Sequence, residues 1–371
     1  KEVRMDGTRK RLFHAPTVEL DRVVITKGIE VRPGVPLTIV TEVDPVDPIS
    51  RDLASGVYPP QYDRLLGLLQ TIVPVGGRVL DLGAHVGTFS LAAAALGYEV
   101  LAVEASPRNA ALLQASIEAN EFRQIRLIHA AVSDRSGSLE FCANGPWGHV
   151  STGHTVVPTV RVPAVTAEQI LDDHGWDRVD FVKIDIEGSE VAALEGMKRL
   201  LTGPDSPPLF VESNGHTLNF FDQTPNTLKK SLKRYGYQAF LVEPDSLVPV
   251  NEGELQPSCC VDLLALKQWP AGTRTIRLDP PLNRAEIIAR VVQASCMNNP
   301  HERRHVARVL QGASVSILSD IRVVSLVTQL RSDDDGSIRE EAGRIRLPGA
   351  ITRRMVRLAT GLQRESGDRG R

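Results

Sequence analysis

Short apolar runs alternate with longer amphipathic segments between residues 57 and 267. Runs rich in Val, Ile, Leu and Phe, bounded by turn residues, favour β-strands. Since strands that alternate with helices form a sheet covered on both faces, we predict an α/β fold with a mostly parallel, Rossmann-like sheet. The last two of its seven predicted strands are joined by a loop containing Pro and Gly, so this pair can be antiparallel. The predicted strands are residues 78–82, 99–103, 125–130, 180–184, 208–213, 237–242 and 260–266.

The segments on either side of this alternation have different patterns. Residues 1–56 contain short β-type runs and a Pro-Asp stretch, which together predict a small strand-rich appendage. Beyond Pro281, apolar residues recur at helical spacing over 287–292 and again over 351–362. We therefore predict three parts: a strand-rich N-terminal appendage (1–56), an α/β domain (57–267) and a helical C-terminal extension (268–371).

Composition narrows the class of protein only slightly. The 371 residues are 42% hydrophobic with a net charge of −2, which is ordinary for a globular protein and gives no general case for nucleic-acid binding. The four cysteines have no C-x-x-C spacing, so neither a zinc site nor a disulfide framework is predicted. No apolar run reaches the ~18 residues of a transmembrane helix and no signal peptide is visible, so we expect a cytoplasmic protein.

Charge is unevenly distributed, and the C-terminal extension is basic. From Ala271 onward the chain has 18 Arg, no Lys and 11 acidic residues, a surplus of seven positive charges. Arg353, Arg354 and Arg357 lie beside the apolar stripe at 351–362, a pattern that allows contact with an acidic partner or a membrane surface. Such a helix more often docks its apolar face and leaves its arginines in water. A homodimer surface or a lid is a further alternative for this extension.

The most informative motif follows the first predicted strand of the sheet. It reads Asp81-Leu-Gly83-Ala84-His85-Val-Gly87 and precedes a helical run. A glycine lets a ligand approach the backbone, and the start of a helix offers free N–H groups. The second glycine of the dinucleotide pattern G-x-G-x-x-G is replaced by His85, which disfavours a nicotinamide-dependent oxidoreductase. A turn with a carboxylate suits the cationic S-adenosylmethionine better than a pyrophosphate, so we predict that these residues bind it.

Glu104 ends the next predicted strand and lies twenty-one residues after Gly83. An acid near this distance occupies the tip of the neighbouring strand, where it can bind both hydroxyls of a ribose. A solvated loop acid is the alternative, and the Ala-Ser-Pro sequence that follows, typical of a helix start, argues against it. We therefore predict that Glu104 binds the ribose of the cofactor.

A second motif lies in residues 179–190, Val-Asp-Phe-Val-Lys-Ile-Asp-Ile-Glu-Gly-Ser-Glu. An apolar strand carries Lys183 and then ends in Asp185 and Glu187. The carboxyl ends of parallel strands border the crevice in which such sheets bind ligands. Packing alone has no use for three charges at alternate positions, so we predict that this strand end belongs to the active site.

With these motifs the chain resembles the FkbM family of S-adenosylmethionine-dependent methyltransferases over about residues 58–267. The Lys-x-Asp-x-Glu-Gly element is specific to the family, whereas the glycine turn is shared by class I methyltransferases in general. The resemblance implies a class I methyltransferase fold and a cofactor site that includes Asp185. It further implies a hydroxyl acceptor on a sugar, macrolide, glycan or other secondary metabolite. The matching residues also include the run 131–134, with Ser133 and Asp134 as further cofactor-binding candidates, and the run 162–166.

A hydroxyl is a poor nucleophile near neutral pH, so its methylation needs a general base or a metal ion. One hypothesis is that Asp185, Glu212 and Asn214, at the ends of adjacent strands, hold Mg²⁺ through oxygen ligands. The other, slightly favoured, is metal-free catalysis with His216 or Glu187 as the base. Lys183 and Asp185 complete the set of catalytic candidates.

Three features leave alternatives open. Residues 142–164 form either a lid-like polar loop with an aromatic residue and two histidines or an ordinary surface hairpin. Residues 301–305 match the zinc motif H-E-x-x-H, but the intervening Arg-Arg pair would repel a dication, so we expect no zinc. A methyltransferase-like scaffold that binds ligands without turnover is the non-enzymatic alternative. The intact turn argues against it on the cofactor side only.

Overall fold

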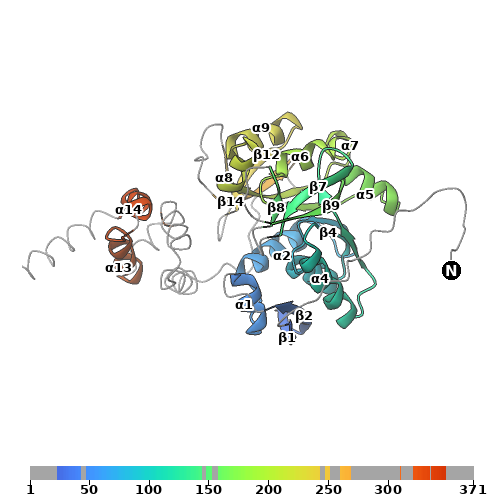
Figure 1. Ribbon diagram of the computed structural model, residues 1–371, viewed down its shortest axis with the longest axis horizontal. Helices are drawn as coiled ribbons and strands as arrows, with labels where there is room; N and C mark the ends of the chain where they lie inside the picture. The colour runs from blue at the N-terminus through green and yellow to red at the C-terminus, as the bar shows by residue number, and fades with distance from the viewer. Residues whose placement is uncertain are drawn as a thin grey trace, which may run out of the picture. The chain divides into compact units, whose positions relative to one another are not determined.

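Figure 1 shows a computed structural model of the protein. It describes residues 23–42, 47–143, 148–152, 158–242, 247–250, 260–268, 310, 321–334 and 336–347. The chain divides into two compact units, Lys1–Pro280 and Pro281–Arg371, and each unit is described by itself.

The first unit is built around a mixed sheet of eight strands. All seven strands predicted from the sequence are present in it, and the short edge strand β13 was not predicted. Strands β11, β10, β3, β4 and β5 are parallel neighbours, whereas β14 runs antiparallel to both β11 and β12, as the loop between the last two predicted strands suggested. In spatial order the strands are β13 (Leu247–Pro249), β12 (Gln238–Val242), β14 (Cys260–Leu266), β11 (Leu209–Asn214), β10 (Phe181–Ile184), β3 (Arg78–Leu82), β4 (Glu99–Glu104) and β5 (Ile125–His129).

Alternate residues along each strand enter two different hydrophobic cores. Val79 of β3 packs in the core beneath α2 (Pro60–Ile72), α3 (Thr88–Ala95) and α4 (Pro107–Ala119). Leu80, the next residue, packs in the core on the other face. That second core is covered by α5 (Ala167–His174), α6 (Glu190–Glu195), α7 (Lys198–Thr202) and α9 (Pro225–Arg234). Because both faces are covered, the sites open to ligands are the ends of the strands.

The order of the strands marks one position at the edge formed by their carboxyl ends. From β3 the chain proceeds to β4 and β5 on one side, and then returns to place β10 and β11 on the other side of β3. Connections that leave two neighbouring strands in opposite directions open a crevice beyond their carboxyl ends, where α/β sheets bind ligands. The glycine turn follows β3, and the second motif runs through β10 and past its carboxyl end, so both predicted site motifs lie at this switch point.

Described parts of the polar segment at 142–164 belong to a second, smaller sheet. Its four strands are β6 (Ala131–Val132), β9 (Thr159–Val165), β7 (Gly137–Cys142) and β8 (His149–Val150), in that order. Strands β7 and β8 pair antiparallel, so the described part of the segment has the backbone pairing of a hairpin. Trp147 and His154, which suggested a binding loop, lie outside the described residues.

The strand-rich N-terminal part is a hairpin of β1 (Val23–Arg32) and β2 (Val35–Glu42), followed by α1 (Pro48–Ala54). Ile29, Leu37 and Ile39 of the hairpin are buried in the same core as α4. The side chain of Asn120, at the end of α4, bonds both backbone groups of Thr38 on β2. The hairpin thus shares a core with the central sheet.

The second unit contains the described helices α13 (Ile321–Leu330) and α14 (Gly336–Gly343). They share a small core that includes Val327 and Ile338, and the Arg331 guanidinium donates to the carbonyl oxygens of Ala342 and Ile345. The predicted stripes at 287–292 and 351–362, the H-E-x-x-H motif at 301–305 and the Arg353, Arg354 and Arg357 cluster lie outside the described residues. Within the described part of the chain, every helix is too short or too polar to cross a bilayer.

The attachment of the hairpin gives a stability prediction. We expect Asn120→Ala to lower the free energy of unfolding by about 1–3 kcal/mol, because it removes the acceptor of the Thr38 N–H (2.9 Å) and the donor to the Thr38 carbonyl (2.6 Å). Glu118→Ala, at an exposed position on the same helix, is the control and should cost about 0.5 kcal/mol or less. Urea unfolding followed by circular dichroism measures both, and equal losses would contradict the prediction.

Candidate functional site

The turn between β3 and α3 is held from below by the neighbouring strand. The N–H groups of Gly83 and Ala84 both donate to the Val103 carbonyl of β4 at 2.9 Å. Gly83 and Gly87 have φ angles of +84° and +92°, a region that side chains other than glycine rarely adopt. The turn therefore has one defined shape, set by β4 beneath it and by its two glycines.

The structure gives a further reason for these glycines, in addition to the approach of a ligand that the sequence predicts. A Cβ on Gly83 would lie 1.8 Å from the Asp185 carbonyl oxygen, and one on Gly87 would lie 2.2 Å from a methyl group of Leu113. The missing Cβ atoms thus make room for the loop after β10 and for helix α4, and glycine also permits the positive φ angles.

Glu104, at the end of β4, is bonded to the turn. It is 6% exposed. Its Oε2 accepts the N–H of His85 and its Oε1 accepts the N–H of Ser106, both at 2.8 Å. Burial raises the pKa of Glu104, while His85 and these two N–H groups oppose the rise. The prediction thus placed the side chain correctly at the tip of the strand next to the turn.

His85 has a φ of +53°, a left-handed conformation that a histidine tolerates better than a branched residue. Its Nε2 lies 3.7 Å from a carboxylate oxygen of Asp47, the residue that caps α1. Its Nδ1 is buried and has no hydrogen-bond partner among the described residues. His85 therefore flanks the turn and connects it to the N-terminal part of the chain.

Lys183 is buried between the two motifs, with 2% of its side chain exposed. Its Nζ lies 3.2 Å from Asp81, 3.3 Å from Asp185 and 2.9 Å from the Gly83 carbonyl oxygen. Burial alone would lower the pKa of Lys183, but the two carboxylates outweigh it and hold the pKa above its ordinary value. Asp81 is fully buried and also accepts the hydroxyl of Ser90 on α3 at 2.6 Å. Lys183 and Asp81, both predicted site residues, thus interact with groups of the protein itself.

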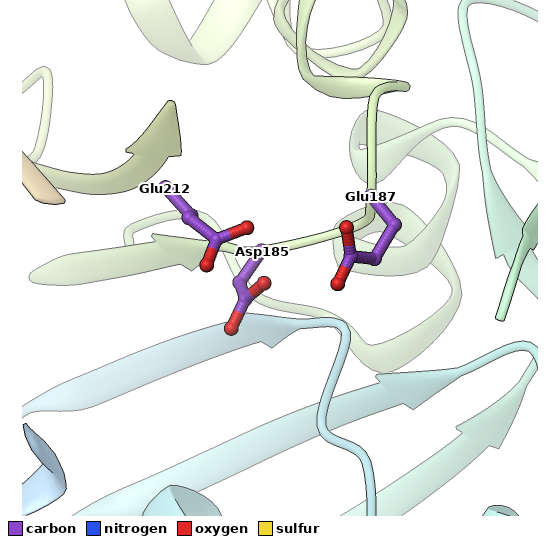
Figure 2. A group of neighbouring side chains, drawn as sticks. All are labelled: Asp185, Glu187 and Glu212. Atoms are coloured by element: carbon purple, nitrogen blue, oxygen red, sulfur yellow. The ribbon is translucent and has the colours of Figure 1, made fainter. Parts of the chain in front are cut away.

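Three carboxylates meet where β10 and β11 end, and we call Asp185, Glu187 and Glu212 the acid cluster. One oxygen of each lies within 4.8 Å of one oxygen of each of the others. Figure 2 shows the three carboxylates turned toward a common space. Glu187 has a φ of +51°, and the side-chain amide of Asn214 donates to its carboxylate at 3.5 Å. Glu212 has one buried oxygen without a hydrogen-bond partner within the described structure.

Burial and mutual repulsion raise the pKa of several carboxyl groups in this region. Burial, with the charges of Asp185 and Glu190, raises the pKa of Glu187 to about 8. Burial, and then the charge of Asp185, raises the pKa of Glu212 well above its ordinary range. Burial raises the pKa of Glu190 to about 7 and that of Asp262, on β14, to about 6. Lys183 compensates part of the negative charge, and the rise in these pKa values is the response to burial and to the charge that remains.

Sequence reasoning missed Glu190, Asp262 and Tyr62 as neighbours of this region. The Glu190 carboxylate accepts hydrogen bonds from the N–H groups of Ile186 and Gly188, and so holds the loop that carries Glu187. Asp262 could have been found, because a carboxylate within an apolar strand needs a partner or a proton. Tyr62 lies on α2, and its pKa is raised by burial despite the opposing charge of Lys183. No motif connects α2 to the site.

The predicted metal ligands are only partly together. Asp185 and Glu212 belong to the acid cluster, but Asn214 uses its Oδ1 to accept the His216 N–H and so caps α8 (Gly215–Leu218). Its amide nitrogen instead lies 3.5 Å from Glu187. The oxygen that we predicted as a ligand is thus already bonded within the protein, and Glu187 takes the third place.

His216, the other candidate base, is exposed on α8. Its ring contacts Phe220 edge-on at 5.1 Å between centroids, and His149 of β8 lies at the same distance on that ring. The two histidines that the sequence left in separate segments thus meet at one aromatic residue.

Ser133 and Asp134 lie at the end of β6, where the hydroxyl of Ser133 donates to Asp134 at 3.1 Å. The Ser133 N–H donates to the Val165 carbonyl at 2.9 Å. A Cβ on Gly196 would come within 2.1 Å of the Ser133 carbonyl oxygen, so this turn is packed closely against the end of α6. Their contacts in the structure serve the junction between the small sheet and α6.

Residues 81–239 match the family model of the methyltransferase FkbM domain. The match contains the glycine turn, Glu104 and the acid cluster, and over these residues it confirms the resemblance that the sequence motifs indicate. None of the curated proteins matches the chain in sequence.

Solved structures of methyltransferases are similar to this chain at low identity. A precorrin-6y C5,15-methyltransferase from Geobacter metallireducens GS-15 has 15% identity and a TM-score of 0.35, over 56% of this chain and 89% of that one. The T. thermophilus 16S rRNA N2 G1207 methyltransferase has 18% identity and a TM-score of 0.34, over 68% and 53%. Fibrillarin from Aeropyrum pernix, with S-adenosyl-L-methionine bound, has 14% identity and a TM-score of 0.32, over 55% and 74%. Scores at this level support no argument about activity.

The glycine turn gives a prediction with a matched control. Gly83 and Gly76 both have left-handed φ angles, +84° and +88°, but a Cβ on Gly76 would meet nothing within 4 Å. We expect Gly76→Ala to lower the free energy of unfolding by about 1–2 kcal/mol through backbone strain alone. Gly83→Ala adds a clash with the Asp185 carbonyl and should cost about 2–5 kcal/mol. Urea unfolding measures both, and equal losses would show that the contact with Asp185 is unimportant.

Proposed function

We propose that this FkbM-family protein is an S-adenosylmethionine-dependent O-methyltransferase whose acceptor is a hydroxyl of a sugar, macrolide, glycan or related secondary metabolite. The observation that carries the proposal is the meeting of the glycine turn, Glu104 and the acid cluster at one edge of the sheet. The class of acceptor comes from the family. A hydroxyl acceptor also agrees with the need for proton removal, which a group of carboxylates can meet.

The residues around the turn fit the cofactor. Each oxygen of Glu104 accepts one N–H bond, so each keeps a lone pair for a ribose hydroxyl. We assign cofactor contacts to Glu104 and to the turn residues Ala84 and His85. Asp81 acts indirectly, because its carboxylate faces Lys183 and Ser90. The bound cofactor supplies the methyl group on a positively charged sulfur, and the negative surplus of the acid cluster favours a cation nearby.

Glu187 is our candidate for the general base. Methyl transfer needs the acceptor oxygen held in line with the methyl group, so a base must also be close to the glycine turn, which we now call the cofactor turn. Glu187 lies two residues beyond Asp185, whose carbonyl touches Gly83 of that turn, and its carboxylate faces the common space of the acid cluster. His216 stays the alternative base, at the rim beside Phe220.

A divalent ion is the competing hypothesis for the same cluster. Three carboxylates within 4.8 Å of one another are a donor set that suits Mg²⁺. Asp185, Glu187 and Glu212 would hold the ion, and it would lower the pKa of the acceptor hydroxyl. Asn214 donates to Glu187 at 3.5 Å, and Glu190 accepts the N–H groups of the loop that carries Glu187. Because the Glu187 side chain is thus placed without an ion, we keep the metal-free route as the proposal.

We assign the reaction to residues 57–267 and no chemical step to the flanking parts, 1–56 and 268–371. We also propose that the Arg-rich C-terminal segment contacts an acidic partner, a membrane surface or a second copy of the chain. A cytoplasmic location is proposed with it.

Cofactor binding can be tested before any acceptor is known. We expect wild-type protein to bind S-adenosylhomocysteine in calorimetry and Glu104→Ala to weaken binding about tenfold to a hundredfold, because bonds to a carboxylate are lost. Glu99→Ala is the control, since Glu99 is exposed at the opposite end of the same strand. Absence of binding to folded wild-type protein would refute the methyltransferase proposal.

The acceptor chemistry is tested by release of S-adenosylhomocysteine from S-adenosylmethionine in the presence of hydroxylated sugars and macrolides. We expect turnover that EDTA does not change, and a loss of about a hundredfold or more in kcat for Glu187→Gln, because a general base is removed. A larger loss in His216→Gln than in Glu187→Gln would move the base to His216. Loss of activity in EDTA, restored by Mg²⁺, would support the metal hypothesis. Cofactor binding without turnover would favour the binding scaffold.

A further inference from the structure

The Lys183 ammonium is surrounded by oxygen atoms of the protein itself. It donates a hydrogen bond to the Gly83 carbonyl at 2.9 Å and forms ion pairs with the carboxylates of Asp81 and Asp185, at 3.2 and 3.3 Å. With these three neighbours and 2% of the side chain exposed, the ammonium is closed off from an acceptor substrate. We predicted Lys183 as a catalytic candidate, and its geometry indicates a different role.

The three acceptors belong to two parts of the site. The Gly83 carbonyl is the first peptide group of the cofactor turn, whereas the Asp185 carboxylate belongs to the acid cluster. Asp81 fixes the ammonium from a third side and is itself held by Ser90 of α3. Displacement of either the turn or the Asp185 carboxylate therefore leaves a buried charge with an incomplete set of partners.

Such a displacement is costly. A buried ion is stable only with good geometry to its partners, and removal of one partner is typically far more disruptive than the same change at a surface. The backbones of the two parts also meet, because the Asp185 N–H donates to the Leu82 carbonyl at 3.0 Å. The side-chain network thus adds to a direct backbone contact between the strand that precedes the turn and the segment that begins the acid cluster.

We propose that Lys183 is a positioning residue that couples the cofactor turn to the acid cluster, so that a change at Asp185 alters cofactor affinity through the Lys183 ammonium. The proposal rests on the proposed function, in that the turn is the part that binds S-adenosylmethionine. It separates Asp185 from the direct cofactor contacts, where the sequence had placed it, and gives it an effect at a distance.

A double-mutant cycle with S-adenosylhomocysteine as the probe tests the coupling. Asp185→Asn should weaken binding about fivefold or more in the wild-type background. In a Lys183→Met background the same change should have no effect on the Kd, because the connection is already absent. Equal effects of Asp185→Asn in the two backgrounds would overturn the proposal and would make Asp185 a direct ligand.

Lys183→Met leaves the buried carboxylate of Asp81 and the partly exposed carboxylate of Asp185 without their cation, and can prevent folding. The cycle is then carried out on Lys183→Met/Asp81→Asn, which keeps the net charge of the three groups at the wild-type value. Asp81→Asn alone is its matched reference, and a thermal unfolding transition confirms that each variant is folded. The expected and contradicting results are the same as in the first cycle.

An NMR measurement separates failure of this inference from failure of the proposed function. The carbonyl ¹³C resonance of Gly83 reports the bond from Lys183 without any ligand. We expect Asp185→Asn to shift it when Lys183 is present and not when Lys183 is replaced by Met. A shift that is identical in both backgrounds would overturn the inference even if the cofactor binds. If wild-type protein binds no S-adenosylhomocysteine, the proposed function fails while this resonance still decides the coupling.

Discussion

The geometry of this site depends on one buried cation. Lys183 is a residue of β10, in register with Asp81 of the neighbouring β3, at the point where the strand order reverses. Its ammonium contacts the carboxylates of Asp81 and Asp185 and the carbonyl of Gly83. Without the cation, Asp81 and Asp185 would be two like charges close together with little water around Asp81. Burial of an ion is unfavourable unless partners are in place, so the network is stable only when the strand ends hold their observed arrangement.

The surplus of negative charge on the other side of Asp185 follows from this arrangement. One ammonium cannot neutralise Asp81, Asp185, Glu187, Glu212, Glu190 and Asp262 together, and the rise in the pKa of Glu187 and of Glu212 is the response to burial and to these neighbours. A cluster of this kind has a high affinity for positive charge or for protons. The sulfonium of the proposed cofactor, a proton from a hydroxyl acceptor and a divalent ion all meet this requirement, so the same carboxylates support both mechanistic hypotheses.

Much of the fold could be predicted because the inner strands of the central sheet, such as β3, β4 and β10, are almost fully buried and therefore read as largely apolar runs. Strands β8 and β13 are two and three residues long, and nothing local distinguishes them from a loop. The motif positions were also predictable, since strand ends at a switch point must face the crevice. Side-chain directions were not: Asn214 caps α8, and this follows from the helix that begins after it rather than from its place on β11.

The N-terminal part of the chain is more closely connected to the site than its sequence indicates. Asp47 caps α1, and the same carboxylate lies 3.7 Å from His85 in the cofactor turn. His85 in turn donates its backbone N–H to Glu104, the residue proposed to bind the ribose. A change in the position of α1 would therefore affect the Glu104 carboxylate through His85 alone. The hairpin before α1 is bonded to α4, whose N-terminal cap Ser106 donates its own N–H to Glu104. Glu104 thus accepts hydrogen bonds from His85 and from Ser106, and both residues belong to parts of the protein that contact the N-terminal segment. The N-terminal segment therefore belongs to the framework that positions the proposed cofactor site.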